Sequence, residues 1–285
     1  MIAKHSLSLL LAAAAFIPSA KAELPSLEDK IWLGYFAGHS CRDCLLGVST
    51  KCDISFQLEP EKGKGSNGAG ILPHSSTSII VGIEEDMPNG KPSIRTIRPE
   101  SLETKNDPTS KLEKTVITGK VTGDATFELT IERDRSGFIL SNRLIDPGKL
   151  TKNPIRPVVS LRIPTIYRHD KDGEPSKAQL KEREKDSLDV KWTDGKRKKL
   201  DLSDSMDAGT EAVNGPGVSI AQVEAGGIIR GRKLTVGALE GVSILKIDNP
   251  ASQPLNSGLR FTAIPAPAKP GAKPGDTARL VISVR

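Results

Sequence analysis

The chain has 285 residues, of which 36% are hydrophobic, 27% are charged and only 4% are aromatic. The scarcity of aromatic residues weighs against functions that depend on stacking, such as single-stranded nucleic-acid binding or sugar binding on aromatic platforms. Glycine follows no three-residue period and no heptad pattern persists, which excludes collagen-like and coiled-coil chains. The length fits one or two domains.

The first 22 residues have the features of a secretory signal peptide. Lys4 supplies a positive charge, residues 7–17 form a short apolar run, and Ala20 and Ala22 match the small-residue cleavage pattern. We therefore expect export to the periplasm or the extracellular space, and a mature chain without a transmembrane segment. Removing this segment with its two lysines lowers the formal net charge from +6 to +4, which is too mild to indicate a nucleic-acid partner.

Short runs of alternating apolar and polar residues, separated by Gly, Pro, Asn and Asp, dominate the mature chain. Their close spacing predicts an all-β protein of antiparallel β-sandwich architecture rather than alternating βαβ units. The expected strands cover residues 31–36, 53–58, 78–83, 114–121, 125–132, 137–143, 158–167, 188–193, 198–202, 218–223, 227–230, 233–236, 242–247, 259–264 and 278–284.

The segment 145–157 contains three prolines and a glycine, and it is the best candidate for a domain boundary. We expect two sandwich-like domains, 23–150 and 151–285, with one large sandwich as the alternative. A capping-box spacing at Ser176 and Gln179 also predicts one short surface helix, over residues 177–186.

One hairpin can be predicted in its register. A three-residue loop ending at Gly195 places Leu188 opposite Leu200, so that the apolar side chains of both strands, including Trp192, share one face. A two-residue loop would instead place the apolar side chains opposite Arg and Lys. The three-residue loop is therefore favoured, with Gly195 at the left-handed position of a bulge.

All three cysteines lie within twelve residues, and a histidine precedes them. A disulfide from Cys52 to either Cys41 or Cys44 is the favoured interpretation, because an exported chain meets an oxidising environment. The alternatives are a tetrahedral metal site of His39, Cys41, Cys44 and Cys52, a redox-active pair formed by Cys41 and Cys44, and free thiols or an intermolecular bridge.

Nucleophilic catalysis has little support, since neither a G-x-S-x-G nor an H-E-x-x-H motif occurs. The other histidines of the mature chain, His74 and His169, are expected in exposed loops. Ser243 and Lys246 match S-x-x-K, but on a strand these two positions face opposite sides. Residues 170–174 fail the calcium-loop pattern, and the basic run 196–199 is best explained as a solvated strand edge, with acidic-polymer or anionic-lipid binding as the alternative.

The sequence thus predicts an exported, non-catalytic protein of the cell envelope with a binding or structural role, and it implies no catalytic residues and no cofactor. Its expected partners are an envelope protein or a polysaccharide, and not a nucleic acid. Two alternatives stay open: an exported hydrolase acting on glycans through a carboxylate pair, and a metal or thiol-redox protein that uses the cysteine and histidine cluster.

Overall fold

The computed structural model describes residues 23–28, 32–41, 44–58, 77–163, 177, 181, 184–202, 211–224, 233–248, 259–267 and 275–285. The expected signal peptide and most of the expected surface helix lie outside these residues. Within them, no helix is long and apolar enough to cross a lipid bilayer.

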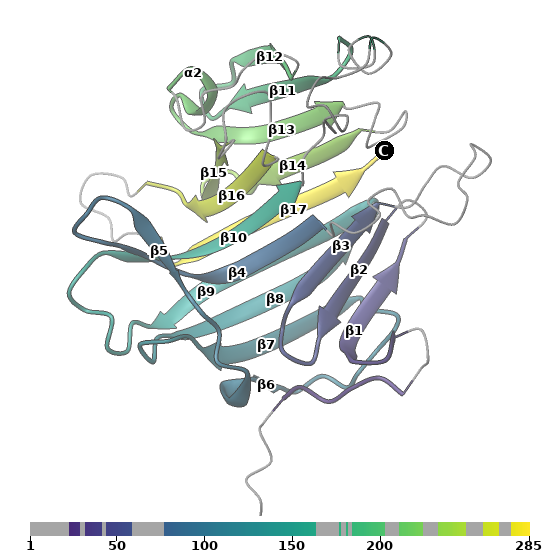
Figure 1. Ribbon diagram of the computed structural model, residues 1–285, viewed down its shortest axis with the longest axis vertical. Helices are drawn as coiled ribbons and strands as arrows, with labels where there is room; N and C mark the ends of the chain where they lie inside the picture. The colour runs from purple at the N-terminus through teal and green to yellow at the C-terminus, as the bar shows by residue number, and fades with distance from the viewer. Residues whose placement is uncertain are drawn as a thin grey trace, which may run out of the picture.

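The described strands form one 17-stranded sheet in which neighbouring strands pair in antiparallel fashion (Figure 1). The sheet curls so that its two halves pack face to face, and the predicted all-β antiparallel sandwich is confirmed. The halves, called the front and back layers below, are joined where Val218 of β13 pairs with Leu245 of β15. Short alternating runs explain this architecture, because each strand buries one face and exposes the other.

The front layer runs in the order β1-β2-β3-β4-β10-β16-β15, with β5 on the edge of β4 beyond β3. Its strands are β1 Tyr35–Ser40, β2 Cys44–Ser49, β3 Ile54–Leu58, β4 Thr77–Asp86, β5 Pro92–Arg95, β10 Ile155–Ile163, β15 Ser243–Asp248 and β16 Leu259–Pro265.

The back layer runs in the order β6-β7-β8-β9-β17-β14-β13-β11-β12. Its strands are β6 Glu103–Thr104, β7 Lys114–Lys120, β8 Thr126–Asp134, β9 Gly137–Asp146, β11 Ser187–Trp192, β12 Arg197–Asp201, β13 Val218–Glu224, β14 Leu234–Ala238 and β17 Thr277–Val284. Among the described residues, the short helices η2 Pro99–Ser101 and α2 Glu211–Asn214 lie in the connections.

A single hydrophobic cluster fills the space between the layers, and it draws on residues from both sides of residue 150. Its largest fully buried side chains include Phe36, Phe56, Phe127, Phe138 and Phe261. Strands from the two sides also pair directly, β4 with β10 and β9 with β17. The division into 23–150 and 151–285 stays a prediction, and the layers themselves are built from both segments.

The β11–β12 hairpin has the register predicted from its sequence. Leu188 lies opposite Leu200, Trp192 N donates to Lys196 O, and Gly195 has a φ of 87°. The strand expected over 31–36 differs, since β1 begins only at Tyr35. Trp32 instead folds back onto Gly38, where an added Cβ would lie 2.2 Å from the indole ring.

Candidate functional site

The expected disulfide from Cys52 is absent, because the three cysteines are thiols in the structure. Cys41 and Cys44 flank the turn between β1 and β2, where Cys41 N donates to Cys44 O at 2.7 Å. Cys52 follows the opposite end of β2, a strand about 17 Å long, whereas a disulfide needs Cα atoms within about 7 Å. The prediction of a bridge to Cys52 was therefore wrong.

The same geometry separates the four residues of the hypothetical metal site. His39 pairs with Leu46 near Cys41 and Cys44, at the end of the hairpin remote from Cys52. No group of three metal-ligating side chains gathers anywhere in the described part of the chain. His39 is buried, its Nδ1 has no hydrogen-bond partner, and its ring packs edge-on against Phe138. Burial, followed by the charge of Arg133, lowers the pKa of this histidine.

A groove of about 470 Å³ opens in the front layer, where the edge of β4 is incompletely covered. β3 pairs with β4 as far as Ile79, and β5 takes up the pairing again at Ile83. The span from Ile79 to Ile83 is about 13 Å. The turn before β3 and the segment that follows β5 form the walls of this β3–β5 groove.

The backbone of Val81 lies in the middle of this gap. Asp86 N donates to Pro154 O, so the backbone groups of Asp86 point toward β10. Along an antiparallel strand, successive residues direct their N–H and C=O groups to alternate sides. The even-numbered residues of β4 therefore pair with β10, and the odd-numbered residues face the other edge. Pro157, which has no N–H, accordingly lies opposite the odd-numbered Ile83. Val81 therefore presents its N–H and C=O to the β3–β5 groove, where no strand of the described chain pairs with it.

An unpaired backbone donor and acceptor in a groove call for a partner, either water or a ligand. Around Val81 the lining is mixed: Lys51, Asp53, Ser78 and Thr96 are polar, while Ile80, Ile94, Ile97 and Pro99 are apolar. Ile80 and Ile94 are each 39% exposed, which is high for isoleucine in a sheet. The groove thus offers a backbone donor and acceptor within a lining that is partly apolar and partly polar.

Cys52 and Arg95 also line the groove, but neither side chain is available to react with a ligand or to form an ion pair with it. Burial, followed by the neighbouring charge of Asp53, raises the pKa of Cys52 to about 12, so its thiol is protonated at neutral pH and is a poor nucleophile. The guanidinium of Arg95 binds Glu85, which also accepts a hydrogen bond from Asn153 at 2.7 Å. The hydrogen bonds from Asn153 and Arg95 lower the pKa of the Glu85 carboxyl. Arg95 therefore shapes the wall and is occupied by its own ion pair.

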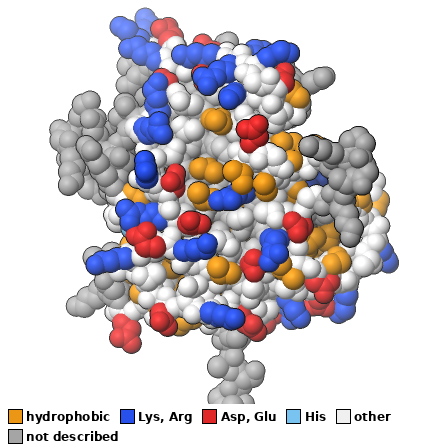
Figure 2. Space-filling model, turned by 180° about the vertical axis from the view of Figure 1, so that it is seen from behind, with side chains coloured by type: hydrophobic (Ala, Val, Ile, Leu, Met, Phe, Trp, Pro, Cys, Tyr) orange, Lys and Arg blue, Asp and Glu red, His pale blue; other side chains and the backbone are white. Residues whose placement is uncertain are grey.

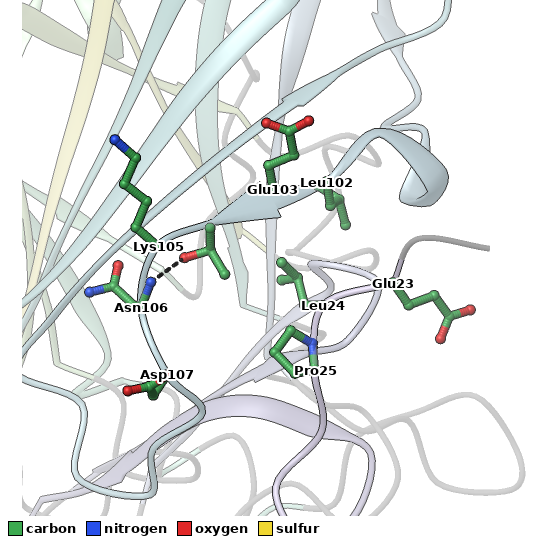
Figure 3. A pocket seen from close by; sticks show the side chains of 9 residues that line it. Glu23, Leu24, Pro25, Leu102, Glu103, Lys105, Asn106 and Asp107 are labelled. Carbon is green, nitrogen blue, oxygen red and sulfur yellow. Dashed lines mark hydrogen bonds between the residues drawn. The ribbon is translucent and has the colours of Figure 1, made fainter. Parts of the chain in front are cut away.

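A second groove, of about 550 Å³, lies between the segment that starts at Glu23 and residues 102–107 (Figure 3). Its floor contains the buried side chains of Leu24 and Leu102. The carboxylates of Glu23, Glu103 and Asp107 point in different directions around it, as Figure 3 shows. The carboxylate of Glu23 accepts a hydrogen bond from Thr50 at 3.3 Å. The lining therefore does not bring two carboxylates face to face, as glycoside hydrolysis requires.

Other predicted positions fall into two groups. His74, His169 and residues 170–174 lie outside the described residues. Ser243 is buried on β15 while Lys246 is exposed on the opposite face, which confirms that this pair cannot act together.

The basic run 196–199 lies on and before β12, whose described pairing is with β11 alone, as expected of a strand edge protected by lysines. Sequence reasoning missed the β3–β5 groove, because its key group is a backbone amide.

Neither a family model nor a curated protein matches this chain. Among solved structures, similar chains include an α-N-acetylgalactosaminidase from Bifidobacterium bifidum in complex with GalNAc, with 12% identity and a TM-score of 0.48. That match covers 85% of this chain and 35% of the glycosidase, so this chain spans about a third of its length.

Another similar structure is a galactose mutarotase-like protein from Lactobacillus casei, with 7% identity and a TM-score of 0.47, covering 87% of this chain and 99% of that one. At these identities and scores, the likeness concerns the arrangement of strands. It assigns neither a ligand nor an activity to this chain.

Proposed function

We propose that this chain is an exported, non-catalytic binding protein that holds a saccharide bearing an N-acylated amino group in the β3–β5 groove. The observation that carries the proposal is the Val81 backbone, whose N–H and C=O face the groove without a strand partner. The carbonyl of an acylated amino group can accept a hydrogen bond from the Val81 N–H, and a hydroxyl beside it on the sugar ring can donate one to the Val81 C=O. Together these two groups can replace the missing strand at this one position.

The size of the gap favours a compact amide over an extended peptide. A peptide that adds to a sheet edge needs several consecutive backbone positions. Here β3 covers the edge of β4 up to Ile79, and β5 covers it from Ile83 onward. Within β4, this leaves Val81 as the residue whose N–H and C=O at that edge have no strand partner. A ligand with one amide on a small ring fits such a short gap.

The remaining lining suits a polyol. The Ser78 hydroxyl, the Asp53 carboxylate and the Lys51 ammonium supply donors and acceptors in the lining of the groove. The partly exposed isoleucines of the lining, Ile80 and Ile94, supply apolar contact for the C–H faces of a sugar ring. These contacts bind and orient a ligand, and they include one carboxylate rather than a facing pair.

The test compares three ligands by isothermal titration calorimetry: a trimer of N-acetylglucosamine, the matching trimer of glucosamine, and a tripeptide. We expect the acetylated trimer to bind at least about tenfold more tightly than the other two, since the loss of a buried hydrogen-bonded pair costs about 1–2 kcal/mol. Equal binding of the two trimers, or tighter binding of the tripeptide, overturns the proposal.

A matched pair of variants locates the site. Val81→Pro removes the N–H that faces the groove and leaves the pairing with β10 intact, whereas Val81→Ala loses a similar part of the side chain and keeps the N–H. We expect Val81→Pro to lose binding of the acetylated trimer and Val81→Ala to keep it. If Val81→Pro does not fold, Ile80→Trp fills the groove instead, with the exposed Ile145→Trp as its control. Unchanged binding in Ile80→Trp overturns the assignment.

A further inference from the structure

The outer face of the back layer presents an arginine that forms no ion pair with any acidic residue in the described part of the chain. Arg279 lies on β17 and faces outward, and its Nε is buried without a hydrogen-bond partner. Its position is well defined, because Ser243 Oγ accepts a hydrogen bond from Arg279 N at 2.7 Å and donates one to Thr277 O. By contrast, Arg143 on the adjacent strand binds Glu128 at 2.9 Å.

On the side of β9 and β8, the neighbours of Arg279 across the sheet are hydroxyl groups. Ser141 of β9 lies directly opposite Arg279, and Thr130 of β8 lies opposite Ser141. All three side chains are half-buried on the same outer face. Neither hydroxyl makes a side-chain hydrogen bond within the described part of the chain. Buried polar atoms are normally satisfied, and the buried Nε of Arg279 is not. With the two half-buried hydroxyls beside it, this guanidinium offers hydrogen-bond donors to an anionic, hydroxyl-bearing ligand.

The adjacent row of paired residues, two positions along the strands from Arg279, begins with apolar side chains and ends with basic ones. Ile139, Val281, Gly237 and Ile220 follow one another across β9, β17, β14 and β13, and the same row continues to Lys191 and Arg197 on β11 and β12. Figure 2 shows hydrophobic side chains gathered in a band across the middle of the face seen from behind, with basic side chains within it and above it. The backbone positions of Arg279 and Lys191 are three strand spacings and two residues apart, which is about 16 Å.

We propose that this face, defined by Thr130, Ser141, Arg279, Lys191 and Arg197, binds an acidic polysaccharide. An extended chain with repeated carboxylates can reach Arg279 and the basic end of the row at once, because its charges recur along its length. Its hydroxyls can bind Ser141 and Thr130. The row contains no aromatic side chain on which a base could stack, which favours a carbohydrate over a single-stranded nucleic acid.

The site lies on the back layer, whereas the β3–β5 groove lies in the front layer. The two proposals are therefore tested independently. The experiment titrates a hexamer of galacturonic acid into the full mature protein, with a hexamer of glucose as the neutral comparison and a single-stranded DNA oligonucleotide as the nucleic-acid comparison. We expect the acidic hexamer to bind, and the other two to bind at least about tenfold more weakly.

The matched variants are Arg279→Gln and Arg143→Gln. Each removes an arginine from the same face, but Arg143 has an acidic partner, Glu128, and Arg279 has none in the described part of the chain. We expect Arg279→Gln to weaken binding of the acidic hexamer at least about tenfold and Arg143→Gln to change it less than about twofold. Arg279→Lys keeps the charge and should restore part of the affinity, which separates loss of binding from loss of folding. Equal effects of the two glutamine variants, or DNA binding as tight as that of the acidic hexamer, overturn the proposal.

Discussion

Asn142 of β9 donates a hydrogen bond from Nδ2 to the carbonyl oxygen of Gly82 in β4, 2.8 Å away across the interior between the two layers. The same amide group donates to Val158 O in β10 at 3.2 Å. Asn142 is fully buried, and its Oδ1 has no partner. One polar side chain thus ties the back layer to the two central strands of the front layer, next to Val81 and the β3–β5 groove.

The contribution of Asn142 can be measured directly. We expect Asn142→Ala to lower the free energy of unfolding by about 2–3 kcal/mol, because it removes two hydrogen bonds and leaves a small cavity. Asn142→Leu fills the space and removes the unsatisfied Oδ1, so we expect a change within about 1 kcal/mol. Urea unfolding followed by circular dichroism measures both. A loss in the leucine variant as large as that in the alanine variant would contradict this account.

Two glycines of the back layer give a second prediction. A Cβ added to Gly137 at the start of β9 would lie 1.9 Å from Ile282 O, whereas one added to Gly237 in β14 meets its nearest atom at 3.7 Å. We expect Gly137→Ala to destabilise by about 2–3 kcal/mol, because the backbone of β17 cannot move aside without loss of pairing. Gly237→Ala should change stability by less than about 0.5 kcal/mol. Equal melting temperatures of the two variants would refute this close approach.

Cys52 makes stability depend on alkaline pH. Its pKa is raised from 9.0 to about 12 in the folded protein, so between these values the unfolded state releases the proton first. The contribution of Cys52 is therefore fully present below pH 9 and is lost as the pH rises toward 12, by up to about 1.4 kcal/mol per pH unit.

Unfolding measured from pH 8 to pH 10.5 tests this dependence on Cys52. We expect a smaller fall in the free energy of unfolding for Cys52→Ala than for the unsubstituted chain. Cys41→Ala, which removes the half-buried thiol at the other end of the hairpin, should keep the full slope. Identical slopes for Cys52→Ala and the unsubstituted chain would show that this thiol is not the cause.

The export prediction has a direct chemical test. Cleavage after Ala22 would leave Glu23 as the first residue, next to Leu24, whose N–H donates to Thr50 O and whose side chain is buried. We expect mass spectrometry of the protein recovered from an exporting host to give the mass of residues 23–285. Recovery of the intact chain in the cytoplasmic fraction would contradict the predicted signal peptide.

Local patterns in the sequence predicted those parts of the fold that depend on neighbouring residues. The register of Leu188 with Leu200 follows from alternation and one turn glycine, and the structure has that register. The pairing of distant strands carries no such local pattern. Cys44 and Cys52 are close in sequence, yet β2 runs between them and holds them apart.

The candidate sites were hidden from the sequence for the same reason. Val81 lies in an ordinary alternating strand, and its backbone is uncovered because β3 ends and β5 begins on either side of it. Arg279 has the same local pattern as Arg143, and the two differ in whether an acidic residue lies on the neighbouring strand. Both features require the strand order, which the sequence pattern does not specify.

Hydrogen exchange of the Val81 amide, followed by NMR, tests the central claim most directly. In the unliganded protein we expect this amide to exchange much faster than those of Ile79 and Ile83, which face the same edge of β4 and are covered by β3 and β5. Addition of the N-acetylglucosamine trimer should protect the Val81 amide, and the glucosamine trimer should not. An amide already protected without ligand, or one whose exchange neither sugar changes, would contradict the proposed site.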